Sequence, residues 1–135
     1  MRILLDTNII LDFFLERQPF YLESSQLFDA IASGTVQGFL SASSATDIFY
    51  ISRRQTRSIE TARHILRTTL ELLTACPVTQ AILDTAFHSG IPDFEDAVQI
   101  ACAVAAVLDA IAPRDPVDFQ NSPVPARSIV ALLNC

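Results

Sequence analysis

Aspartates mark the positions in this sequence where catalytic chemistry is most readily built. The first ends the apolar run of residues 2–5, and the six that draw attention are Asp6, Asp47, Asp93, Asp96, Asp115 and Asp118. Carboxylates that meet in one cleft repel one another, and a bound divalent cation relieves that repulsion. If the fold brings these residues together, the pattern predicts a metal-dependent hydrolase.

The elements that must position these carboxylates alternate between strands and helices. Apolar runs predict strands at residues 2–5, 36–41, 73–78 and 110–113. Helical spacing and caps predict helices that begin near residues 7, 22, 43, 58, 79, 92 and 125, the sixth ending near 109 and the last at 133. Such alternation indicates a three-layer α/β/α fold with a central parallel sheet, in a single domain that spans residues 1–135.

Asp6 is the strongest single candidate for function. It ends a buried strand, and ligands of parallel sheets bind beyond the carboxyl ends of the strands. The same residue is also suited to cap the helix that begins at Thr7 or Asn8. Asn8 is expected either to support the Asp6 carboxylate by a hydrogen bond or to act as a further cap.

Asp93 and Asp96 lie three residues apart, just before the most apolar helix. Asp93 suits a helix cap, whereas Asp96 projects from the face that continues through Gln99, where a charge needs a partner or a metal. Glu95 is expected to point elsewhere, into solvent.

The remaining acidic candidates carry weaker signals. Asp115 and Asp118 follow the last predicted strand and are placed to approach Asp6, although an aspartate-stabilised turn around Pro116 explains them equally well. Asp47 in a first helical turn is favourable for the helix dipole alone. Neither histidine and no serine has the setting of a catalytic group.

Arginine supplies all of the positive charge, since the 9 Lys and Arg residues include no lysine. Five of them, here called the hairpin arginines, are concentrated in two adjacent predicted helices: Arg53, Arg54, Arg57, Arg63 and Arg67. Guanidinium groups bind phosphate in a bidentate manner, so these residues either contact an RNA backbone or form a solvated helix face.

Composition narrows the class of protein. Half of the 135 residues are apolar and 18% are charged, which excludes a disordered chain. The net charge of −6 argues against a protein that simply coats nucleic acid. Three widely spaced cysteines and the lack of a signal or membrane-spanning run predict a reduced, cytoplasmic protein that enters no membrane.

Four segments of the sequence resemble PIN-domain ribonucleases, in particular small VapC-like toxins of toxin–antitoxin pairs: residues 4–12, 44–51, 93–99 and 114–119. The first and third are fairly specific. The resemblance implies a metal-dependent endoribonuclease that binds Mg²⁺ or Mn²⁺ and cleaves single-stranded RNA. It also implies a homodimer and a small antitoxin protein as partner.

Site residues follow from the same resemblance. It implies a catalytic set of Asp6, Asp47, Asp96 and Asp115, metal ligands Asp6, Asp96, Asp115 and Asp118, and supporting residues Thr7, Asn8 and Asp93. The chain departs from the family pattern where Asp47 replaces the usual glutamate and Pro113 the usual threonine.

Those departures favour an alternative function: a weakly active or inactive PIN-fold module that binds RNA or a protein. Two other classes fit less well. A receiver domain pairs its acids with a lysine, which this chain lacks, and a haloacid-dehalogenase-type phosphatase needs an aspartate where Asn8 stands.

Overall fold

The structure, a computed structural model, describes residues 1–134 and has a parallel sheet at its centre. In these residues the sheet has four strands: β1 (Arg2–Leu5), β2 (Gln37–Ser41), β3 (Thr74–Cys76) and β4 (Ala110–Ala112). Their order is β3-β2-β1-β4, and every neighbouring pair is parallel. The predicted parallel α/β/α fold is confirmed.

The order of the strands creates a crevice at the carboxyl end of β1. The chain moves from β1 to β2 and β3 on one side, and later returns to place β4 on the other side. Connections therefore leave β1 and β4 in opposite directions, which is the topological switch point where open α/β sheets bind ligands. Asp6 follows β1 directly, and its backbone N–H donates to the Ala112 carbonyl at 3.0 Å.

Helices cover both faces of the sheet. Over residues 1–134 they are α1 (Thr7–Phe14), α2 (Tyr21–Ala32), α3 (Ala42–Thr56), α4 (Ile59–Leu72), α5 (Gln80–Phe87), α6 (Phe94–Ala105), a 3₁₀ turn η1 (Pro116–Phe119) and α7 (Ile129–Leu133). None of these helices has the length and apolar character needed to cross a bilayer.

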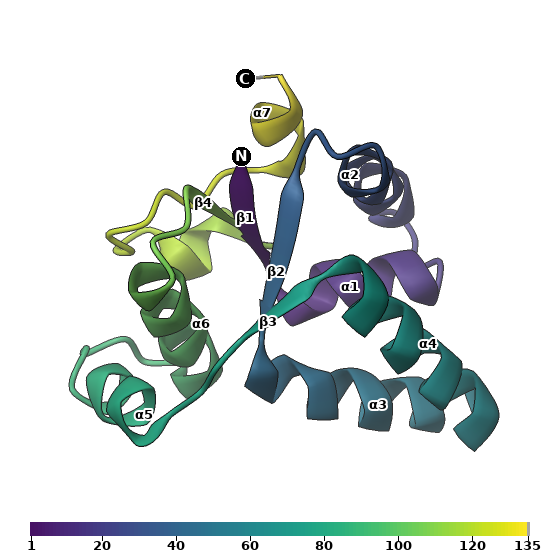
Figure 1. Ribbon diagram of the computed structural model, residues 1–135, viewed down its shortest axis with the longest axis horizontal. Coiled ribbons are helices and arrows are strands. Elements are labelled where there is room, and N and C mark those ends of the chain that lie inside the picture. The colour runs from purple at the N-terminus through teal and green to yellow at the C-terminus, as the bar shows by residue number, and fades with distance from the viewer. Residues whose placement is uncertain (135) are drawn as a thin grey trace.

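Alternation of side chains along β1 divides the core into two clusters. Ile3 and Leu5 pack on the face covered by α1 to α4 and α7, whereas Leu4 packs on the opposite face with α5 and α6. Figure 1 shows α5 and α6 on one side of the sheet and α1, α3 and α4 on the other. Because all three side chains are fully buried, β1 is held firmly on both faces.

The α3–α4 hairpin begins at the carboxyl end of β2. Arg57 closes α3 in the left-handed conformation (φ 56°), and Ser58 caps α4 by accepting a hydrogen bond from the Thr61 N–H at 3.1 Å. These two residues reverse the chain, so the two helices pack side by side, as Figure 1 shows.

The aromatic residues near the end of α1 and the start of α2 divide between core and surface. Phe13 and Phe14 pack against the core, and the Phe13 ring stacks on Phe28 with 4.2 Å between the ring centroids. Phe20 remains 37% exposed, and Tyr21 is half-buried. The first two side chains are therefore part of the protein's own core.

Three predicted boundaries of helices and strands in the carboxyl-terminal half of the chain were wrong. The helix expected to reach residue 109 ends at Ala105, and Val107 then takes a positive φ of 54°. The strand expected over 73–78 is only Thr74–Cys76. The terminal helix begins at Ile129 rather than at 125, because residues 125–127 pair with Ile111 beside β4.

The cysteines agree in part with the expectation of reduced thiols. Cys76 and Cys102 are free and buried, and burial raises the pKa of both thiols, that of Cys102 to about 11. Raised values keep these sulfurs protonated and unreactive at neutral pH. Cys135 lies outside the described residues.

Candidate active site

Asp6 occupies the switch point with little access to water. It lies at the start of α1, is only 8% exposed, and makes no side-chain cap to that helix. Gln99 Nε2 donates to Asp6 Oδ1 and the Arg114 backbone N–H to Asp6 Oδ2, both at 3.4 Å. Burial raises the pKa of the Asp6 carboxyl, and these long hydrogen bonds lower it only in part.

Thr7 ties three elements together next to Asp6. Its buried hydroxyl lies 2.7 Å from the Ser44 hydroxyl on α3 and donates to Glu95 Oε1 on α6 at 3.0 Å. Gln99 Nε2 donates to the same Glu95 oxygen at 3.4 Å. Thr7 therefore links α1 to α3 and α6 beside Asp6, and its supporting role remains a prediction.

The prediction that Glu95 points away into solvent was correct for its exposure and wrong for the direction of its carboxylate. The residue is exposed, but its Oε1 accepts hydrogen bonds from Thr7 and Gln99. Burial raises the pKa of Glu95, the Thr7 hydrogen bond lowers it, and the charges of Asp47, Asp6 and Asp93 raise it further. Glu95 therefore belongs with the candidate site.

Asp96 has the most strongly altered acidity of these carboxylates. Its pKa rises to about 7, first because of burial and then because of the negative charges of Asp93, Asp6, Asp118 and Glu95. At neutral pH such a group is close to half-protonated. A cation bound nearby would lower its pKa and leave the carboxylate ionised.

Six carboxylates are called the acidic cluster. They are Glu95, Asp96 and the residues whose negative charges raise the pKa of one or both of them, namely Asp6, Asp47, Asp93 and Asp118. Asp47 enters from α3, and its charge acts on Glu95. Asp93 caps α6 by accepting from the Asp96 N–H at 2.9 Å, so the capping explanation of Asp93 holds alongside its electrostatic effect. The exposed Asp118 acts on Asp96 from η1.

Asp115 and Asn8 are engaged elsewhere. The exposed Asp115 carboxylate accepts from the Val117 N–H at 3.1 Å and caps η1, which is the turn role considered for it above. The Asn8 side-chain oxygen accepts from Arg17 at 3.3 Å and not from a group of Asp6. The Asn8 backbone N–H lowers the pKa of Asp6, and a supporting role for Asn8 remains a prediction.

A pocket of about 580 Å³ opens beside the acidic cluster, between α5, α6 and η1. Asp93, Asp96 and Asp118 line it together with apolar side chains such as Ile100 and Val117. The pocket gives a ligand room to approach Asp96 from one side.

Oxygen donors of this kind suit Mg²⁺ or Mn²⁺, which prefer carboxylate ligands. The buried Gln99 Oε1, which has no hydrogen-bond partner in the described chain, is a further oxygen of this type. Within residues 1–134, however, no three His, Cys, Asp or Glu side chains lie close enough together to hold an ion. The donors thus fit a divalent cation in chemistry, but do not converge on one point.

The hairpin arginines lie on α3 and α4, or between them, and all five side chains are exposed. None forms an ion pair with another residue of the described part of the chain. Arg53 lies about 16 Å from the start of α3 along the helix axis, because an α-helix rises 1.5 Å per residue. An extended polyanion that contacts the hairpin arginines must therefore span that distance to reach the carboxyl end of β2.

Solved structures with the same fold come from toxin–antitoxin systems. VapC20 of Mycobacterium tuberculosis, described as a toxin that cleaves the sarcin-ricin loop, aligns with a TM-score of 0.74 and 16% identity over 90% of this chain and 95% of its own. VapBC2 of Rickettsia felis, bound to a promoter DNA fragment, gives 0.68 and 14% over 95% and 98%. A toxin–antitoxin complex of Klebsiella pneumoniae gives 0.68 and 20% over 93% and 96%.

At these identities the structures establish the fold. A search of curated proteins finds no match. The sequence pattern of the PIN domain matches residues 2–116, which contain β1 to β4 and every member of the acidic cluster except Asp118. The chain therefore belongs to the PIN-domain family.

Proposed function

We propose that this protein is a metal-dependent endoribonuclease that hydrolyses phosphodiester bonds of single-stranded RNA. The observation that carries the proposal is the acidic cluster at the switch point, in which Asp96 has a pKa of about 7 and Asp6 is buried without a cationic partner among residues 1–134. Such an arrangement is costly for folding and is explained by a divalent cation that binds there.

In this proposal Asp6 and Asp96 are the principal ligands, with Asp47, Asp118 and Glu95 as further carboxylates of the acidic cluster. Bound Mg²⁺ or Mn²⁺ would lower the pKa of water and neutralise charge on the phosphate. Asp115 caps η1 through Oδ1, and Oδ2 is the oxygen that it would offer to a cation.

The chain's own residues contribute orientation and substrate contact. Thr7 and Gln99 fix the Glu95 and Asp6 carboxylates, and the hairpin arginines bind the RNA backbone to one side of the cleavage point. Single-stranded RNA suits the distance between the hairpin and the carboxyl ends of the strands, because an unpaired strand is flexible and follows a positively charged surface.

The likeness to VapC20, VapBC2 and the Klebsiella pneumoniae complex supports a wider biological role. We propose a toxin of a toxin–antitoxin pair, which acts in the cytoplasm as a homodimer of 1–135 domains and is silenced by a small antitoxin protein.

The test is cleavage of a panel of single-stranded RNAs by wild type, Asp6→Asn, Asp96→Asn and the exposed control Asp29→Asn, each with Mn²⁺, Mg²⁺ or a chelator. We expect the first two variants to lose at least 100-fold in rate and the control to match wild type. Cleavage that survives in Asp6→Asn or in chelator would contradict the proposal.

A second function is favoured by one observation, namely that no three acidic side chains of residues 1–134 converge on an ion site. The protein would then be a catalytically weak PIN module that binds RNA or a protein through the α3–α4 hairpin. Calorimetry with Mn²⁺ separates the two: binding that Asp96→Asn abolishes supports the nuclease, and RNA binding without Mn²⁺ binding or cleavage supports the module.

A further inference from the structure

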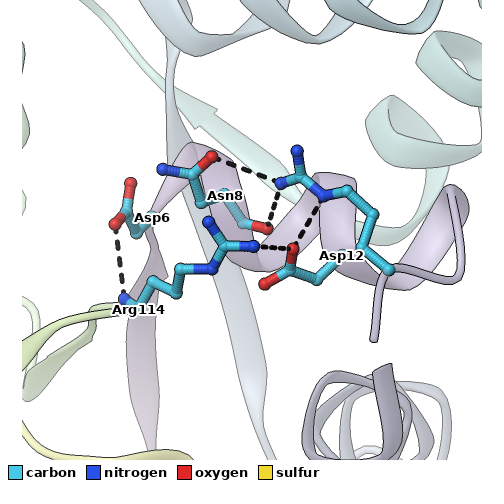
Figure 2. A network of polar contacts seen from close by, with 5 residues as sticks. Asp6, Asn8, Asp12 and Arg114 are labelled. Carbon is cyan, nitrogen blue, oxygen red and sulfur yellow. Dashed lines mark hydrogen bonds and ion pairs between the residues drawn. The ribbon is translucent and has the colours of Figure 1, made fainter. Parts of the chain in front are cut away.

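Asp12 is a fully buried charge that lies outside the acidic cluster. It is 0% exposed on α1, and its Oδ1 accepts from Arg17 Nε at 2.8 Å and from Arg114 at 2.7 Å. Figure 2 shows the two guanidinium groups converging on this carboxylate, with Asp6 and Asn8 beside them. No other carboxylate of residues 1–134 takes part in an ion pair.

Stability alone does not account for this network. Burying a carboxylate costs several kcal/mol, and ion pairs of this kind frequently stabilise a fold no better than apolar residues of the same size. Asp12 Oδ2 and Arg114 Nε, moreover, are buried and lack hydrogen-bond partners within the described chain. A cost of this kind is retained where the network holds something in place.

Arg114 connects this network to the candidate site. Its guanidinium lies between Asp12 and the Phe20 ring, 3.9 Å from the ring centroid, so it is held from two sides. The backbone N–H of the same residue donates to Asp6 Oδ2. The position of the guanidinium therefore governs the position of a donor to the Asp6 carboxylate.

The backbone around Arg114 transmits that constraint. Pro113 precedes it in a buried position, and Pro116 follows two residues later at the start of η1. Proline restricts its own φ and the conformation of the residue before it, so this loop has few alternative paths. Because the Arg114–Asp6 hydrogen bond is long, at 3.4 Å, a small displacement of the loop is enough to break it.

We infer that Asp12 and Arg114 are positioning residues, which hold the loop after β4 so that its N–H orients the Asp6 carboxylate. This inference rests on the proposed function, because the orientation of Asp6 matters for binding the cation there. Groups that orient metal ligands in this way commonly contribute 10–100-fold to metal affinity or activity.

The chain offers a matched pair of variants for the test. Arg114→Met and Arg17→Met each remove one ion pair from the same Asp12 oxygen, and the two arginine side chains have similar exposure, 29% and 23%. Arg17 also donates to the carbonyl and side-chain oxygens of Asn8 but not to Asp6, whereas residue 114 belongs to the loop that donates to Asp6. If the network only stabilises the fold, the two variants behave alike.

Two measurements on these variants decide the question. In metal-free protein we expect the residue 114 amide to lose protection from hydrogen exchange in Arg114→Met, after correction for the intrinsic exchange rate of the new residue, and to keep its protection in Arg17→Met. We expect calorimetry to show Mn²⁺ binding weakened 10–100-fold in Arg114→Met and less than 3-fold in Arg17→Met. Equal changes in both variants, or unchanged protection in Arg114→Met, would overturn the inference.

Phe20→Leu is the second variant in case Arg114→Met does not fold, because it frees the guanidinium from the ring and leaves both ion pairs intact. We expect a smaller loss of exchange protection at the residue 114 amide, and unchanged protection overturns the inference. A wild type that neither binds Mn²⁺ nor cleaves RNA contradicts the proposed function, while the amide measurements still decide whether the network orients Asp6.

Discussion

Replacing Asp96 by asparagine should make the metal-free protein more stable at neutral and alkaline pH. The Asp96 pKa is about 7 in the folded protein instead of 3.8, because of burial and the nearby charges of Asp93, Asp6, Asp118 and Glu95. The ionised form is thus disfavoured by folding. Asparagine has nearly the same shape and carries no charge, so it removes that penalty.

The size of the effect follows from the two pKa values. At ~1.4 kcal/mol for each pH unit between them, the penalty has an upper limit of about 4 kcal/mol. Asp96 is only partly buried, so solvent screening reduces this figure, and asparagine forfeits a favourable charge in the first turn of α6. We expect a net gain of ~1–2 kcal/mol, or roughly 3–8 °C in melting temperature.

The pH dependence has a definite sign. Folded Asp96 holds its proton more tightly than the unfolded chain does, so between pH 4 and 7 the folded state binds more protons and wild-type stability falls as pH rises. Below pH 4 both states are protonated, and above 7 both are ionised. The advantage of Asp96→Asn should therefore be small near pH 4, grow up to pH 7 and remain constant above it.

Thermal unfolding of both proteins at pH 4.5, 6 and 8, without metal and with Mn²⁺, is the assay. Glu71→Gln is the control, because it removes one exposed charge from the end of α4 and should give a change that is flat from pH 6 to 8. Mn²⁺ should raise the melting temperature of wild type more than that of Asp96→Asn. A variant that is no more stable than wild type at pH 8, or equally stabilised at pH 4.5 and 8, would refute this reasoning.

Three further changes test other parts of the structure. Gly38→Ala should lower the free energy of unfolding in urea by ~1–3 kcal/mol, because the added Cβ would lie 2.5 Å from Leu73 Cδ2. An unchanged midpoint would show that the neighbouring side chains move aside without loss of stability. Ser58→Ala should cost ~1 kcal/mol, because the Thr61 N–H loses its cap, whereas Ser58→Asp should not. Replacing the hairpin arginines by glutamine should weaken single-stranded RNA binding. The slope of the logarithm of the binding constant against the logarithm of the salt concentration should become less steep by about 0.7 for each phosphate that the variant no longer neutralises. Unaltered thermal unfolding of the variant is the control.

Local signals in the sequence were sufficient to predict the sheet and the place of Asp6 at the end of its first strand. The apolar run of residues 2–5 places Asp6 at a strand end, and β1 has the predicted bounds. Ser58 and Thr79, as predicted, stand at the beginnings of α4 and α5, where the side chains accept the hydrogen bonds of caps. These features depend on neighbours a few residues away, which is the range that sequence patterns report.

Other features depend on contacts that no local pattern contains. The terminal helix starts late because residues 125–127 pair with Ile111, and the burial of Asp12 depends on Arg114, 102 positions away. The direction of the Glu95 carboxylate was predicted wrongly, although the sequence contains a local signal for it. Glu95 lies four residues before Gln99 and therefore on the same face of α6, the face that was expected to be buried.

The signs of the expected stability changes distinguish the two proposed roles of charged residues, that of a metal ligand and that of a positioning residue. Removing Asp96 relieves repulsion, so it should stabilise the metal-free protein while it abolishes cleavage, as expected where a fold tolerates strain for function. Removing Arg114 leaves the buried Asp12 with Arg17 alone, so it should destabilise the protein and weaken Mn²⁺ binding at the same time. A ligand and a positioning residue thus give opposite changes in stability for the same loss of metal binding, and the two roles can be separated before any RNA substrate is known.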